Sequence, residues 1–200
     1  QEKIRTVSSV KAFIPAPNEH LAGLEQVNKD ICASLNSANP QATATLDMDA
    51  TLVETNKRDA LRCYKGFKSY QPLNTWWDEH GIILHTQFRD GNVPAGFDQL
   101  KVFKKALDCL PEGVKKVNLR SDTAGYQHDL LKYCDKTDNK RFGKIEFAVG
   151  CNVTKAFKTA VEQISDSQWH PIYKDHMETG SEWAEVCFVP NELCHSKNAP

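Results

Sequence analysis

The order of hydrophobic patterns along the chain limits its fold more than any other feature of the sequence. Strand-like runs come first, and helix-like and strand-like segments then alternate, each with the apolar spacing typical of its type. In chain order, the predicted elements are strands at 44–53, 73–78 and 82–88, a helix at 94–110, a strand at 114–119, a helix at 123–134, a strand at 144–149 and a helix at 153–164. This pattern predicts an α/β domain.

The predicted order resembles the ribonuclease-H-like fold, in which a three-strand meander is followed by alternating helices and strands. The resemblance implies that the first and fourth strands, 44–53 and 114–119, lie side by side. We therefore expect an α/β fold with a ribonuclease-H-like mixed sheet flanked by helices and a C-terminal strand-rich insertion.

The segments on either side of this core differ from it in pattern. Helical periodicity is visible around 21–35, and the chain becomes strand-like again after Trp169, notably at 183–189. The predicted parts are a helical N-terminal segment (1–42), a ribonuclease-H-like core (43–165) and the start of a strand-rich insertion (166–200). Because the first residue is Gln1 and the first methionine is Met48, we interpret the sequence as a piece of a longer protein.

Overall charge and cysteine content narrow the class of protein. The chain has 25 Lys and Arg residues and 26 Asp and Glu residues, so its net charge of −1 gives no global sign of a dedicated nucleic-acid binder. Its seven cysteines include no Cys-x-x-Cys pair and fit no common zinc pattern, which favours reduced cytosolic thiols. No apolar run approaches the length of about 18 residues that a membrane span needs.

Two carboxylates share one face of the first predicted strand. Asp47 and Asp49 are two residues apart, and side chains two apart on a strand point the same way. Their like charges repel unless a cation offsets them, and Mg²⁺ prefers carboxylate oxygens. The pair therefore predicts a metal site, although a solvated acidic face would give the same pattern.

A third carboxylate, Asp122, directly follows the predicted strand at 114–119. Open α/β sheets place their sites at the carboxyl ends of parallel strands. The alternative is that Asp122 or Ser121 only caps the helix that follows. Acidic residues at the ends of two adjacent strands could share two metal ions that clamp the attacking and leaving oxygens of a phosphodiester.

Several long strings of the sequence resemble the DDE-type transposases of bacterial insertion sequences. They are LDMDAT at 46–51, YKGFKSYQPL at 64–73, FRDGNVPAG at 88–96, LRSDTAGYQ at 119–127, EWAEVCF at 182–188 and HSK at 195–197. The resemblance implies that Asp49, in its apolar-Asp-x-Thr setting with Thr51, and Asp122 are catalytic metal ligands. Asp47 is then a secondary candidate.

The resemblance also implies an enzyme that cleaves and joins DNA. The expected cofactor is Mg²⁺ (or Mn²⁺), and the expected partner is double-stranded DNA, both transposon ends and target. Self-association on DNA is expected, with no membrane partner. The expected localisation is the bacterial cytoplasm, with action at the nucleoid.

The sequence departs from this family at the third acid, a Glu that often stands in a Tyr-x-x-Arg-x-x-x-Glu setting. The last arginine is Arg141, so that setting is absent from the second half. Glu182 and Glu185 lie in a strand-like run, which does not suit a residue expected on a helix. We therefore expect the 200-residue piece to be inactive alone.

A basic and aromatic stretch at 57–70 is the best local candidate for contact with DNA, with Lys and Arg on phosphates and an aromatic ring stacked on a base. A β-edge with ordinary surface charge is the alternative. The expected DNA contacts are Arg62, Lys65, Lys68, Tyr70, Arg89 and Arg120. Arg89 sits in a predicted turn. His85 and His128 are interpreted as core or surface residues and not as ligands.

Two other functions remain open from the residues. The string Asp47-Met48-Asp49-Ala50-Thr51 also resembles the first motif of haloacid-dehalogenase-type phosphatases, in which Asp47 would be the nucleophile and Asp49 the acid/base. The run at 145–152 lacks the acidic pair that this reading needs, and the predicted meander fits it poorly. A non-catalytic, DNA-binding remnant of a transposase is the third alternative.

Overall fold

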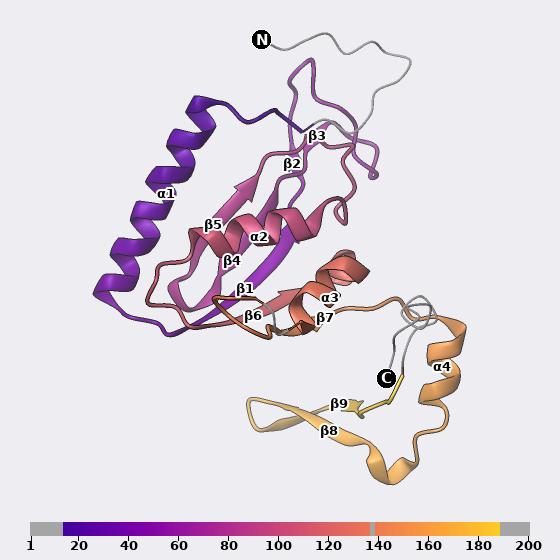
Figure 1. Cartoon of the computed structure of the whole chain (residues 1–200). Coiled ribbons are helices and arrows are strands. Elements are labelled where there is room, and N and C mark those ends of the chain that lie inside the picture. Colours follow the sequence, from indigo (N-terminus) through magenta and orange to yellow (C-terminus); the bar gives the residue numbers. More distant parts are fainter. Residues whose placement is uncertain (1–13, 137–138, 189–200) are drawn as a thin grey trace. The chain divides into compact units, whose positions relative to one another are not determined.

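Figure 1 shows the computed structural model of the chain, which describes residues 14–136 and 139–188. The chain divides into two compact units, with the division between Cys151 and Asn152. Residues 14–42 thus belong to the same compact unit as the sheet, and the boundaries predicted after 42 and 165 stay a prediction. No helix among the described residues combines the length and apolar character needed to cross a bilayer.

The first unit is built on a five-stranded mixed sheet with the strand order β5-β4-β1-β6-β7. The strands are β1 (Thr43–Ala50), β4 (Leu73–Trp77), β5 (Ile82–Gln87), β6 (Lys116–Ser121) and β7 (Glu146–Val149). β4 runs antiparallel to both β1 and β5, whereas β6 runs parallel to both β1 and β7. The expected neighbours, the first and fourth strands of the predicted order, are therefore paired as β1 and β6. This is the ribonuclease-H-like arrangement.

The predicted meander is confirmed: β1, β4 and β5 are antiparallel neighbours, and a short turn joins β4 to β5. A short 3-10 helix, Asp78–His80, joins β4 to β5, and Gly81 closes it with φ 64°, a conformation that favours glycine. The carboxylate of Glu79 accepts hydrogen bonds from the backbone N–H of Thr45, at 3.0 and 2.8 Å. The turn is thereby attached to the start of β1.

The described helices of the first unit cover one face of the sheet. They are α1 (Glu19–Ala38), α2 (Gln99–Cys109) and α3 (His128–Asp135). Each contributes to the same apolar core as the buried side of β1, for example through Cys32, Phe103 and Leu130 packed in the cluster with Leu46 and Met48. The residues between these buried positions on β1 point to the other face, which is where the acidic side chains lie.

The predicted helix at 94–110 begins five residues late. Residues 95–98 form a turn, and Asp98 has φ 53°, which lies in the left-handed region and cannot continue a right-handed helix backward. α1, by contrast, starts where a cap allows it: Asn18 Oδ1 accepts from the N–H of Leu21 at 2.9 Å.

The first strand is also shorter than predicted, since β1 ends at Ala50. The chain then enters a separate two-stranded ribbon of β2 (Val53–Glu54) and β3 (Ser69–Tyr70). The N–H of Thr51 still donates to Pro72 O at 3.1 Å, so the ribbon continues directly from the ends of β1 and β4. The loop between β2 and β3 is the basic and aromatic stretch noted in the sequence.

The second unit contains a short helix and one hairpin. Its elements are α4 (Lys155–Val161), a 3-10 helix at Asp166–Gln168, β8 (His170–Lys174) and β9 (Met177–Trp183). The strands predicted after Trp169 are confirmed as β8 and β9. The prediction for 183–189 is wrong over 184–188: the strand ends at Trp183, residues 184–188 have no regular structure, and Val189 lies outside the described residues. Asp175 and His176 set the hairpin turn with φ 50° and 66°, and neither is the glycine that usually signals such a turn.

Candidate active site

Asp49 is the second-last residue of β1. Its side chain is exposed, on the face opposite to the buried Met48. Among the residues that the structure describes, no hydrogen bond or ion pair holds its carboxylate. An exposed carboxylate on a rigid strand has both oxygens available for a ligand.

Asp122 follows the last residue of β6 in an extended conformation, with φ −72° and ψ −167°. Its Oδ1 accepts from the backbone N–H of Ala124 at 2.9 Å, so it does cap the 3-10 helix Thr123–Gly125. The capping alternative raised by the sequence is therefore real. It does not exclude a second role, because the bond uses one carboxylate oxygen and the side chain is exposed.

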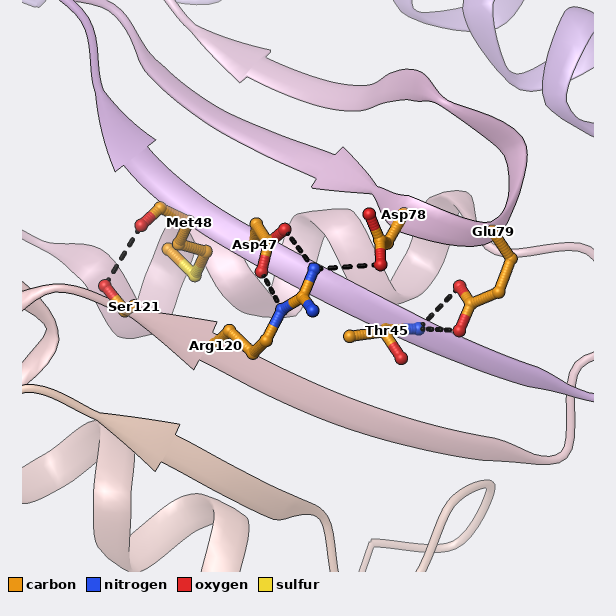
Figure 2. Close-up of polar contacts among 7 residues, drawn as sticks. All are labelled: Thr45, Asp47, Met48, Asp78, Glu79, Arg120 and Ser121. Atoms are coloured by element: carbon orange, nitrogen blue, oxygen red, sulfur yellow. Dashed lines mark hydrogen bonds and ion pairs between the residues drawn. The ribbon is translucent and has the colours of Figure 1, made fainter. Parts of the chain in front are cut away.

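The pairing of β1 with β6 brings the segments that carry these two carboxylates to the same end of the sheet. The parallel register matches Asp47 with Arg120 and Met48 with Ser121. Asp49 and Asp122 each come directly after this last matched pair, and paired strands lie about 4.8 Å apart. Ser121 Oγ donates to Met48 O at 3.0 Å and joins the two strands at this end (Figure 2).

The structure separates Asp47 from Asp49, which strand periodicity treats alike. Figure 2 shows the guanidinium of Arg120 between Asp47 and Asp78. Its Nε and Nη2 donate to both oxygens of Asp47, at 2.5 and 2.6 Å, and Nη2 lies 2.9 Å from Asp78 Oδ2. The hydrogen bonds that Arg120 donates to Asp47, together with the charges of Asp47 and Asp78, raise the pKa of Arg120. Asp47 is thus engaged in an ion-pair network, and Asp49 is not.

The segment that holds Asp122 depends on a glycine. A Cβ at Gly125 would lie 2.4 Å from Ser121 Oγ and 2.5 Å from Ser121 Cβ, closer than any real contact. Gly125 therefore allows the chain to fold back tightly after Asp122. The sequence string at 119–127 contained this glycine, but its role depends on a contact that spacing alone does not show.

Asn74 is a neighbour of Asp49 that the sequence did not single out. It is the register partner of Asp49 on the antiparallel side. Its Oδ1 accepts from Thr86 Oγ1 at 2.8 Å, which fixes the amide on β4. The sequence did not single out Asp78 either, because its ion pair with Arg120 forms only when the sheet has brought the two residues together.

The donor set at the matched end of β1 and β6 fits a hard divalent cation. Asp49 on β1 and Asp122 just after β6 are both exposed carboxylates, and Mg²⁺ takes carboxylate oxygens together with water and substrate phosphate. Asp49 has no competing partner among the described residues, and Asp122 keeps one oxygen free of its cap. The arrangement is suited to a shared metal site at this edge.

The expected DNA contacts fall into different environments. Arg62 and Lys65 are exposed in the loop between β2 and β3, although Arg62 Nη1 donates to Gly66 O. Lys68 Nζ donates to Arg58 O at 2.8 Å. The ring of Tyr70 packs on Phe88 with centroids 4.8 Å apart, so one of its faces is already covered.

Arg89 is a correction to the sequence interpretation. Its side chain is completely buried, with Nε donating to Gln87 Oε1 at 2.8 Å. Burial lowers the pKa of Arg89 to about 10. A guanidinium enclosed in this way does not reach the surface, so we do not include Arg89 in a DNA-binding surface. Arg120 is half-exposed, but its charge is already met by Asp47 and Asp78.

Comparison with protein families shows to which family the chain belongs. The family described as "Transposase DDE domain group 1" matches residues 6–189, which is most of the chain. The chain belongs to this transposase family. Comparison with curated proteins finds no match.

Two solved structures resemble this transposase domain distantly. The Mos1 strand transfer complex is 12% identical, with a TM-score of 0.34, and the similarity covers 71% of this chain and 45% of that one. The Mos1 transposase paired-end complex with left transposon end is 11% identical, with a TM-score of 0.35, and the coverage is 71% and 46%. The transposase domain described here therefore spans less than half the length of these chains.

The phosphatase alternative is not supported for this transposase domain. β4 and β5 form an antiparallel meander beside β1, as the fold of the transposase family requires and as that alternative does not. Asp47, which would have to be the free nucleophile, has both oxygens bound by Arg120.

Proposed function

We propose that this domain supplies two of the metal-binding carboxylates of a DNA transposase, Asp49 and Asp122. The observation that supports the proposal is the register of β1 and β6, whose last matched pair, Met48 and Ser121, comes directly before these two exposed carboxylates. The family match supplies the class of reaction, cleavage and joining of phosphodiester bonds in DNA.

The proposed cofactor is Mg²⁺, with Mn²⁺ as a substitute. When bound, such a cation stabilises the negative charge that develops on the attacking and leaving oxygens. The role of the protein is to hold the ligands: β1 and β6 fix the backbone, Ser121 joins the strands, and the tight turn at Gly125 orients Asp122. The network of Asp47, Arg120 and Asp78 fixes the adjacent part of the same face.

The proposed substrate is double-stranded DNA at transposon ends and target, which places the action inside the cell. The ribbon of β2 and β3 continues from the strand that carries Asp49, and residues 54–72 contain five basic and two acidic residues. We propose that Arg62 and Lys65, which are exposed, contact phosphates there, with Lys68 as a secondary contact. Self-association on DNA is part of the same proposal.

The test uses the transposase that carries this domain and labelled transposon-end DNA. Asp49→Asn and Asp122→Asn are each expected to abolish cleavage in Mg²⁺ and in Mn²⁺. Asp47→Asn, two residues away on the same face, is the matched control and is expected to retain cleavage. Loss of activity on Asp47→Asn with retention on Asp49→Asn would overturn the assignment and would favour the phosphatase alternative.

The third acid is the remaining part of the proposal. Glu182 lies in β9 and Glu185 just after it, and neither is on a helix. We propose that the third ligand is supplied from outside the 200 residues. The isolated chain is then expected to bind Mg²⁺ but to leave DNA intact. Nicking by the purified chain that disappears on Asp49→Asn would contradict this.

A further inference from the structure

A second cluster of potential ligands lies on the helix-covered face of the sheet. It consists of Glu25 on α1, His85 on β5 and Cys109 on α2, and one ligand atom from each lies within 4.8 Å of the others. His85 pairs in register with Thr75, which in turn pairs with the buried Met48. The cluster is therefore on the face opposite to Asp49.

The cluster is enclosed, and its polar atoms are poorly satisfied. His85 is 8% exposed and Cys109 is 5% exposed. Nε2 of His85 is buried with no hydrogen-bond partner among the described residues. Cys109 Sγ is 4.0 Å from Glu25 Oε1, at the outer limit for a sulfur hydrogen bond. A buried imidazole nitrogen without a partner costs free energy, and a bound cation would remove that cost.

We infer that Glu25, His85 and Cys109 form a binding site for a divalent cation of zinc-like softness. Imidazole nitrogen, thiolate sulfur and carboxylate oxygen are the ligands that Zn²⁺ takes in proteins. A neutral imidazole, a thiolate and a carboxylate together balance the charge of a divalent ion. On binding, the Cys109 thiol releases one proton to solvent and its sulfur bonds to the ion.

An entry path and a fourth ligand are available. Glu25 and His85 both line a cavity of about 450 Å³ between α1, β5 and α2, which also reaches Asn28 and Lys105. Water in this cavity can complete a four-coordinate site after three protein ligands are bound. Asn28 Nδ2 donates to Leu84 O at 2.7 Å and fixes α1 next to the site.

Two lysines next to the cluster, Lys29 and Lys105, oppose the binding of a cation. Lys29 Nζ lies 3.5 Å from Glu25 Oε1, the oxygen that is also nearest to Cys109, so Lys29 competes for a ligand. Lys105 adds a second positive charge near His85. Removing the Lys29 charge is therefore expected to tighten binding. A cluster with a merely structural role gives no reason for that result.

A bound ion would hold α1 against the rest of the unit. Only Cys32 and Asn36 of this helix are buried, so few apolar contacts hold it on the sheet. An ion bound by Glu25, His85 and Cys109 would join α1 to both β5 and α2. The ion would stabilise this unit without taking part in chemistry on the other face.

The test is titration of the metal-free chain with Co²⁺, which reports thiolate and imidazole ligation through its absorption spectrum. One equivalent is expected to give a sulfur-to-cobalt charge-transfer band that Zn²⁺ abolishes. Cys109→Ser is expected to remove the band, and His85→Gln to weaken binding by at least about tenfold. Cys134→Ser, at a buried thiol outside the cluster, is the matched control and is expected to keep the band.

Two further variants keep the outcome decisive. Lys29→Gln changes a partly exposed residue and is expected to raise the affinity for Co²⁺, which provides a test even if Cys109→Ser fails to fold. Asp49→Asn is expected to leave the band unchanged, so failure here is distinguishable from failure of the proposed active site. No band in the folded wild-type chain, a band that survives Cys109→Ser, or weaker binding by Lys29→Gln would each overturn the inference.

Discussion

Asp47 and Asp49 provide the sharpest test of the structure, because removing one charge from each is expected to change stability in opposite directions. The two residues are identical in type, share a strand face and are separated by one residue. Asp47 is bound through both oxygens to Arg120, whereas Asp49 has no partner among the described residues and is proposed to share a site with Asp122. The perturbation is the same substitution, Asp→Asn, at each position.

The magnitude for Asp49→Asn comes from the repulsion that it removes. Two unit charges about 5 Å apart in water repel by about 0.8 kcal/mol, and salt at about 0.1 M reduces this to about 0.5 kcal/mol. Both carboxylates are exposed, so the aqueous value applies. Without a divalent cation, Asp49→Asn is therefore expected to raise the free energy of unfolding by about 0.5 kcal/mol.

The magnitude for Asp47→Asn comes from the ion pair that it breaks. Exposed ion pairs contribute about 0.2–1 kcal/mol, and a bidentate geometry favours the upper end. The Asp47 side chain is 33% exposed, which also favours the upper end. The expected loss is about 1 kcal/mol, and the two variants then differ by about 1.5 kcal/mol, or about 3–6 °C in melting temperature.

The assay is thermal unfolding in chelator and again in Mg²⁺, which thiolate and imidazole ligands bind poorly. At a Mg²⁺ concentration ten times the dissociation constant, wild type and Asp47→Asn are expected to gain about 1.4 kcal/mol. Asp49→Asn is expected to gain much less. The reasoning is refuted if both variants melt below wild type by the same amount in chelator, or if Mg²⁺ stabilises Asp49→Asn as much as wild type.

Three other expectations follow from single contacts. Gly125→Ala forces a Cβ to within 2.5 Å of Ser121. It is expected to lower the free energy of unfolding, measured with denaturant, by about 1–3 kcal/mol and to weaken Mg²⁺ binding. A variant as stable as wild type would contradict the contact. Arg62→Gln is expected to reduce the slope of log affinity for DNA against log salt concentration by about 0.9. Lys116→Gln is the control and is expected to leave the slope unchanged, because Lys116 lies at the start of β6, at the end away from Asp122. Burial raises the pKa of the Cys134 thiol to about 12, so above the ordinary thiol pKa the unfolded chain loses a proton that the folded chain keeps. Stability is then expected to fall as pH rises from about 9 toward 12, by up to about 1.4 kcal/mol per pH unit, and a profile no flatter in Cys134→Ala would refute this.

The elements with strong local signals were predictable from the sequence. The strand around Leu46 and Met48 alternates apolar and acidic residues, so it was predicted and is confirmed. The break between the predicted strands at 73–78 and 82–88 is likewise confirmed, and Gly81 closes the turn there. The start of α2 was not predicted, because the left-handed backbone of Asp98 interrupts a segment whose apolar spacing is otherwise helical. Strand structure after Trp169 was predicted, but the hairpin turn between β8 and β9 was not, since Asp175 and His176 occupy it with positive φ and without a glycine.

The candidate site shows where sequence reasoning ends. Composition and spacing identify Asp47, Asp49 and Asp122 as acidic residues at strand ends, but they cannot say which of them has a counter-charge. That depends on Arg120, which is 73 residues from Asp47 and meets it only because β1 and β6 pair in one register. A shift of one residue would turn Arg120 to the buried face and leave Asp47 unpaired.

The same dependence on register explains why Arg89 was misjudged and the second cluster was not foreseen. Arginine is usually exposed, so its position in a loop-like string suggested a DNA contact, whereas the fold encloses it completely. Glu25, His85 and Cys109 are far apart in sequence and follow no metal-binding spacing, yet α1, β5 and α2 bring them together. Local spacing predicts ligands on one element; ligands gathered from three elements require the packing of the core to be known first.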